Sequence, residues 1–141
     1  MPSIREQILA AIQTRLAPTA GIDGRVFRSR NEAVARGEMP AIIVQPIKDE
    51  AESIGGICKT NRELTVKVAI LVHADVPDQA ADPIAVDLHP RLISPGDTTL
   101  GGLALDIQPL EDDFQFAATD GVIVMAYKVW YRHSVFDLAS A

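Results

Sequence analysis

The alternation of residue types between Asn61 and His73 is the strongest constraint on how this chain can fold. Every second position carries an apolar side chain, which gives the series Leu64, Val66, Val68, Ile70 and Val72. Successive side chains of a β-strand point to opposite faces of a sheet. The segment is therefore predicted to be a strand with one buried face and one face in contact with water.

Two amphipathic segments predict helices that pack on this sheet. Ser3 and Glu6 have the spacing of a capping box, and apolar side chains then recur with helical spacing at Ile4, Ile8, Ala11, Ile12 and Leu16. Pro18 and Gly21 end the pattern. A second helix is predicted over residues 79–93, where Pro90 predicts a kink or a break near Val86–His89.

The remaining segments predict further strands and turns. Residues 25–28 form a short strand, and one helical turn is expected at Glu32–Ala35. Residues 41–47 are predicted to be a strand buried on both faces, with Pro46 at its end. The charged, glycine-containing stretch Lys48–Lys59 is interpreted as a long hairpin loop. Short strands at 104–109 and 114–118 flank an acidic loop, and an Asp120-Gly121 turn leads into a strand over 122–133.

This order of elements predicts a single domain, residues 1–141, of the α+β class. Two helices are expected on one face of a mainly antiparallel or mixed β-sheet that carries a long hairpin loop. The other face of the sheet would be partly free to pack on a partner.

Charge is distributed unevenly along the chain. Residues 1–70 contain 10 basic and 8 acidic side chains, whereas residues 71–141 contain 3 basic and 11 acidic ones. Non-specific binding to duplex DNA is excluded, because neutralising phosphates requires clustered Lys and Arg. A solvated loop accounts for the basic stretch Arg25, Arg28, Arg30 and Arg36. The alternative is a subunit interface in which this basic edge meets the acidic residues Glu111, Asp112 and Asp113 of a neighbouring copy.

No residue pattern supports catalysis. The single cysteine, Cys58, excludes an internal disulfide and a multi-cysteine metal site, and His73, His89 and His133 lack a second ligand at metal spacing. Calcium binding by the acidic residues near Asp112 lacks an EF-hand pattern. We therefore expect no enzymatic activity, no cofactor and no metal. The sequence also has no membrane-spanning run and no signal peptide, which favours a cytosolic location.

The sequence resembles the tail-terminator family (minor tail protein U type) of long-tailed bacteriophages. The resemblance covers nearly the whole chain, and its matching segments are Arg5–Leu16, Arg25–Phe27, Glu38–Val44, Glu63–His73, Asp75–Asp78, Leu100–Leu103 and Tyr127–Arg132. It implies an α/β fold and a structural role in the virion.

The resemblance also implies a specific place in the particle. Such proteins assemble in the bacterial host cytoplasm as a ring, usually a hexamer, that caps the tail tube at its head-proximal end. The ring stops tube polymerisation and presents a surface to head-completion or connector proteins, while DNA passes through the lumen without specific binding. On this basis the hairpin residues Ser53, Ile54, Gly55, Gly56, Ile57 and Cys58 are a candidate docking loop for the tube or the connector.

Other functions remain open at this stage. The chain could be another head–tail connector or a tail-tube subunit, because such subunits share the α/β sheet theme. It could also be a small dimeric ligand-binding domain, which would require an apolar pocket with converging polar groups. An enzyme would require an acid or base with a perturbed pKa in a cleft.

Overall fold

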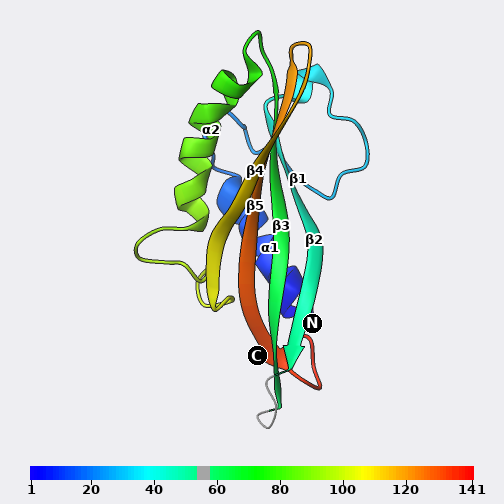
Figure 1. Ribbon diagram of the computed structural model, residues 1–141, viewed down its shortest axis with the longest axis vertical. Coiled ribbons are helices and arrows are strands. Elements are labelled where there is room, and N and C mark those ends of the chain that lie inside the picture. Colours follow the sequence, from blue (N-terminus) through cyan, green and yellow to red (C-terminus); the bar gives the residue numbers. More distant parts are fainter. Residues whose placement is uncertain (54–57) are drawn as a thin grey trace.

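A computed structural model describes residues 1–53 and 58–141 and contains one five-stranded sheet with two α-helices (Figure 1). The elements in chain order are α1 (Ile4–Leu16), β1 (Val26–Arg28), the 3₁₀ turn η1 (Arg36–Glu38), β2 (Ala41–Ser53), β3 (Lys59–His73), α2 (Pro77–Leu92), β4 (Asp106–Ala117) and β5 (Asp120–Ser134). The predicted α+β class is confirmed. The predicted helical turn at Glu32–Ala35 is wrong, since the turn forms at η1 instead.

The sheet is mixed, with the strand order β1-β2-β3-β5-β4. β1 pairs with β2 in parallel, and the other neighbours pair antiparallel. β5 therefore lies between β3 and β4, and the two edge strands are β1 and β4. The alternation predicted for β3 is confirmed, because the side chains of Leu64, Val66, Val68, Ile70 and Val72 are at most 3% exposed.

Both helices supply apolar side chains to one core with this face of the sheet. Ser3 caps α1, since its Oγ accepts a hydrogen bond from the backbone N–H of Glu6 at 3.1 Å. The buried side chains of the helices are Ile4, Ile8, Leu9, Ile12 and Leu16 of α1, and Pro77, Ala81, Ile84, Leu88 and Leu92 of α2. Among the described residues, neither helix is long and apolar enough to cross a lipid bilayer.

The predicted break in α2 is wrong, because one continuous helix runs from Pro77 to Leu92. Pro90 lacks an N–H, so it deprives the helix of one hydrogen bond near its C-terminal end. Leu88 and Leu92 on either side are at most 1% exposed. Packing of these leucines in the core holds the last turn in place.

The prediction of a long loop at Lys48–Lys59 is also wrong. β2 continues to Ser53, and its residues Lys48–Ser53 pair with residues 60–65 of β3. Pro46 lies inside the strand rather than at its end. A bulge at Ile47 follows it. Because β1 pairs only with residues 42–44 of β2, no β1 residue lies beside Pro46 to require a backbone N–H from it. Of the candidate docking loop, Ser53 ends β2 and Cys58 precedes β3, while residues 54–57 lie outside the described residues.

The acidic loop predicted at Glu111–Asp113 is part of a strand. The two predicted short strands are joined in β4, which has a bulge at Leu110. The turn that follows is Ala118-Thr119, two residues before the predicted Asp120-Gly121, and Ala118 takes the left-handed conformation with φ 56°. Gly121 is required for a different reason: a Cβ atom there would lie 2.4 Å from the Cβ of Pro77.

Candidate assembly surfaces

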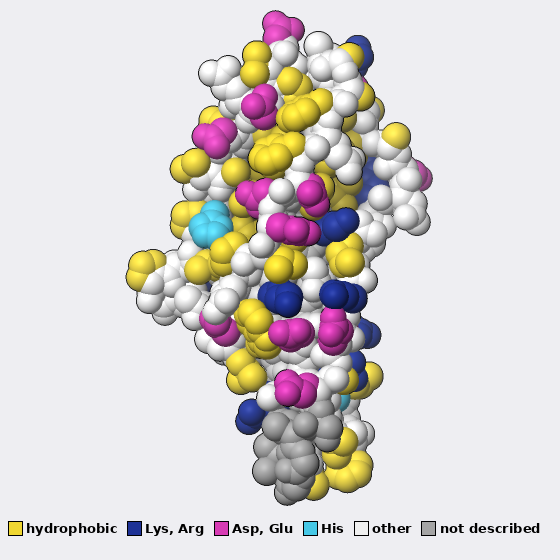
Figure 2. All heavy atoms as spheres, viewed as in Figure 1, with side chains coloured by type: hydrophobic (Ala, Val, Ile, Leu, Met, Phe, Trp, Pro, Cys, Tyr) yellow, Lys and Arg dark blue, Asp and Glu magenta, His cyan; other side chains and the backbone are white. Residues whose placement is uncertain are grey.

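The face of the sheet that points away from the helices is open, and Figure 2 looks onto it. Near the β4–β5 turn it carries half-buried apolar side chains, namely Ile43, Ala69, Leu71, Val122 and Val124. Further down, charged side chains of both signs gather over the middle of this face (Figure 2). Those contributed by the three inner strands are Lys48, Glu50, Glu63, Lys67 and Lys128.

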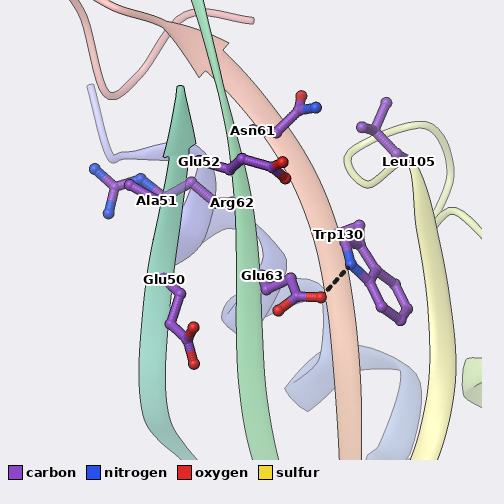
Figure 3. A pocket seen from close by; sticks show the side chains of 8 residues that line it. All are labelled: Glu50, Ala51, Glu52, Asn61, Arg62, Glu63, Leu105 and Trp130. Atoms are coloured by element: carbon purple, nitrogen blue, oxygen red, sulfur yellow. Dashed lines mark hydrogen bonds between the residues drawn. The ribbon is translucent and has the colours of Figure 1, made fainter. Parts of the chain in front are cut away.

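A hollow of about 320 Å³ lies on the lower part of the open face (Figure 3). The indole Nε1–H of Trp130 donates to Glu63 Oε1 at 2.8 Å, and Lys128 Nζ lies 3.9 Å from Glu63 Oε2. Lys48 forms an ion pair with Glu50 at 2.8 Å and lowers the pKa of that carboxyl. The remaining lining residues are Ala51, Glu52, Asn61, Arg62 and Leu105. The carboxylates of Glu50 and Glu63 are thus occupied by a lysine or by the indole N–H, which is typical of polar side chains on a solvated surface rather than of a catalytic general base.

The predicted basic residues lie at and beside the β1 edge, where they bind carboxylates of the same chain. Arg28 forms two hydrogen bonds to Glu6 of α1, at 3.2 and 2.8 Å, and lowers the pKa of that carboxyl. Arg30 binds Glu38 at 2.8 and 3.0 Å and lies 4.5 Å from the ring centroid of Phe27. The first pair joins β1 to α1, and the second joins the two ends of the segment that follows β1.

Arg25 completes the basic group. Its Nε–H donates to the carbonyl of Pro40 at 3.1 Å, and its Nη1 lies 3.3 Å from Asp23. The side chain is 26% exposed, as is that of Arg28, while that of Arg30 is 17% exposed. The three arginine side chains therefore retain some accessible surface beside their internal partners.

The predicted acidic residues lie on β4, the opposite edge strand. Glu111, Asp112 and Asp113 are all exposed, and in the described part of the chain none of them has an ion-pair partner. Strands β2, β3 and β5 separate them from the arginines. The structure therefore does not bring the two predicted groups together within one chain. It places them on opposite edges, where two copies related head to tail would present one to the other.

Two polar clusters were not predicted from the sequence. Asp49 of β2 is 8% exposed and accepts hydrogen bonds from Arg5 Nη1 at 3.1 Å and from the Tyr131 hydroxyl. Asp97 binds Arg15 at 2.7 Å and accepts the backbone N–H groups of Thr99 and Gly101, and these bonds hold the pKa of its carboxyl well below its usual range. The Ser94-Pro95-Gly96-Asp97 turn signal was the one local indication of the second cluster.

The three histidines bind separate protein groups. Nδ1 of His73 lies 2.6 Å from Asp120 Oδ1, and Nδ1 of His89 shares a hydrogen bond with the Tyr127 hydroxyl at 2.8 Å. His133 accepts the Nε–H of Arg62 at 3.0 Å. Over residues 1–53 and 58–141, no three side chains of the metal-binding types lie close enough to hold an ion.

Comparison with solved structures identifies similar folds. A chain from the virion of a native gene transfer agent (GTA) particle superposes with a TM-score of 0.62 over 89% of this chain and 94% of that chain, at 14% sequence identity. At this identity the likeness shows that the two chains share a fold. Neither a protein-family model nor a curated protein sequence matches this chain.

Proposed function

We propose that this chain is a structural subunit of a phage-like virion, and more specifically that it caps the tail tube as a ring. In this role it ends tube polymerisation and provides the surface to which head-completion or connector proteins join. The observation that carries the proposal is the fold shared with a virion chain over nearly the full length of both. The proposal assigns the chain no catalytic role.

The distribution of charge between the two sheet edges supports a ring. A ring is built from heterologous contacts, in which one surface of each subunit meets a different surface of the next. Here the arginines Arg25, Arg28 and Arg30 lie at one edge and the carboxylates Glu111, Asp112 and Asp113 at the other. Their attraction favours the head-to-tail arrangement over pairing of like edges.

The net charge supports a lumen through which DNA moves freely. The chain carries a formal charge of −6, and the charged residues on its open sheet face have mixed sign. Tight binding of a duplex needs several Lys or Arg side chains directed at successive phosphates. A ring of such subunits would let DNA pass without retaining it. The proposed location is therefore the head-proximal end of the tail, after assembly in the bacterial host cytoplasm.

A second candidate is a tail-tube or connector subunit, which the same structural likeness supports, because the chain that shares this fold is part of a whole virion. A small ligand-binding domain finds less support, since the hollow beside Trp130 is lined mainly by charged and amide side chains rather than by an apolar wall.

The test is the mass of the purified protein across concentration, measured by light scattering together with negative-stain imaging. Rings of about six subunits that do not stack, and that block the growth of tail tubes when added to them, are the expected result. Long tubes formed by the pure protein would instead identify a tube subunit. A strict dimer at every concentration would contradict both virion roles.

A further inference from the structure

A small groove with an apolar floor lies between α2 and β4, near the β4–β5 turn. Its floor consists of Ala81 and Ala85 of α2, Phe114 of β4, and Ile123 and Met125 of β5. Phe114 is 56% exposed, and the neighbouring Phe116, stacked on it at 6.3 Å between ring centroids, is 54% exposed. Exposed aromatic rings beside a recess are typical of a surface that a protein partner covers.

Three carboxylates surround this apolar floor. Asp78 and Asp82 lie on the first turns of α2, and Asp112 lies on β4 across the groove. Within the described residues, none of the three forms an ion pair or a side-chain hydrogen bond. An occupant of this groove should therefore combine small apolar side chains with a positive charge.

Within the segment Ser29–Met39 of this chain, residues 33–36 (Ala-Val-Ala-Arg) have that composition. The segment is irregular except for η1, and Val34 and Ala35 precede the exposed Arg36. Arg36 has no ion-pair partner among the residues that the structure describes, unlike Arg30, whose ion pair with Glu38 joins the two ends of the segment. Arg36 is therefore an exposed cation in a loop whose ends are joined by the Arg30–Glu38 ion pair.

The groove and the segment lie at the same level of the sheet, on opposite sides. Ala41, two residues after the segment, begins a row of paired residues that crosses the sheet. The row continues through Leu71 and Val122 to Gln115, which is next to Phe114 in the groove. In Figure 1 the segment projects on the right and α2 lies on the left. Copies placed side by side would bring the segment of one to the groove of the next without a shift along the strands.

We propose that the α2–β4 groove binds the Ser29–Met39 segment of a second copy of this chain, with Arg36 of that copy placed among Asp78, Asp82 and Asp112. This inference rests on the proposed ring and names the contact that joins its subunits. The contact is heterologous, since each subunit donates a segment at one edge and receives one at the other, and it can therefore close into a ring.

The test is a charge exchange between the two surfaces. Arg36→Glu and Asp82→Lys are each expected to raise the concentration at which half of the protein is assembled by about tenfold, because each places like charges together. The double variant, and an equimolar mixture of the two single variants, should return to the wild-type midpoint. Glu52→Lys is the matched control for Asp82→Lys, since it makes the same charge change at an exposed residue of β2, outside the groove.

The outcomes separate the two proposals. If wild-type rings form and the two groove variants assemble like Glu52→Lys, the groove contact is refuted while the ring stands. Failure of the mixture to recover assembly also refutes it. A wild-type protein that neither self-associates nor binds tail tubes contradicts the proposed function, and the groove contact with it. If the groove instead binds a basic peptide of another protein while rings form normally, the second-copy assignment is wrong.

Discussion

Replacing Asp49 by asparagine tests what holds the lower half of β2 in the sheet. The substitution keeps the shape of the side chain and removes its charge. Asp49 is 8% exposed, and its Oδ2 accepts hydrogen bonds from the Tyr131 hydroxyl and from Arg5. Arg62 lies 4.0 Å from Oδ1 and is 22% exposed. Removing one member of a buried charged group destabilises a protein because the remaining charge is left without compensation.

The expected loss can be estimated from these contacts. Arg5 is 44% exposed and regains water, so its share is small. The hydrogen bond from Tyr131 loses its charged acceptor, and Arg62 loses its counter-charge. Hydrogen bonds to charged groups contribute about 1.5–3 kcal/mol each, so we expect the free energy of unfolding to fall by about 2.5 kcal/mol. For 141 residues, at about 2.1 cal/mol/K of unfolding entropy per residue, this lowers the thermal midpoint by about 8 °C.

The assay is calorimetric and urea unfolding of the wild type, Asp49→Asn and the control Glu50→Gln. Glu50 is the next residue of β2, is 59% exposed and also has an ion-pair partner, Lys48. The control should leave the midpoint unchanged, because an exposed pair is well solvated in either state. Equal midpoints for the two variants would refute the argument that the Asp49 cluster fixes this part of the strand.

The further predictions concern substitutions of single residues. Tyr127→Phe removes the buried hydroxyl that bonds to the histidine of α2 and should cost about 1–2 kcal/mol in urea unfolding; an unchanged midpoint would argue against that bond. Gly121→Ala should cost about 1–3 kcal/mol, because its Cβ would overlap the proline that opens α2. Gly96→Ala should be nearly neutral in the same experiment, because a Cβ atom at this position would have no neighbouring atom within 4 Å. Asp97 has a lowered pKa, so its stabilisation is present above about pH 4 and is lost as the pH falls further; a thermal midpoint that falls equally steeply in Asp97→Asn would contradict this.

Periodic segments of the chain could be predicted because their burial repeats locally. The apolar positions of β3 and α1 recur with the periods of a strand and a helix, and each element buries the face that its pattern indicates. Such a signal needs no knowledge of the neighbouring elements. The class of the fold followed from the order of these segments.

The error at Lys48–Lys59 has a physical cause that local composition does not contain. The charged residues there suggested a solvated loop, but Asp49 is buried against Tyr131, 82 positions later in the sequence, and Arg5, 44 positions earlier. The partners that make this segment a strand become visible only in the folded chain. The same holds for Glu111–Asp113, whose strand is exposed on an edge and therefore lacks an apolar pattern.

The candidate surfaces were predicted in part. Charge identified the arginines near Arg28 and the carboxylates near Asp112, but their placement on opposite edges depends on β5 lying between β3 and β4. The internal partners of the arginines were not foreseen, because Glu6 and Glu38 come from separate elements. The apolar groove beside β4 depends on the packing of α2 and has no local signature.

The uninterrupted pairing of β3 with β5 has a mechanical consequence. The two strands pair from Lys59 with Ser134 to His73 with Asp120, without a bulge. Hydrogen bonds between antiparallel strands are perpendicular to the strands. A pull along the strands would therefore load the whole ladder in shear and require many bonds to fail together, whereas a pull across it would open them one pair at a time. The β3–β5 pair is therefore expected to resist a pull along the long axis of the molecule better than a pull across the sheet.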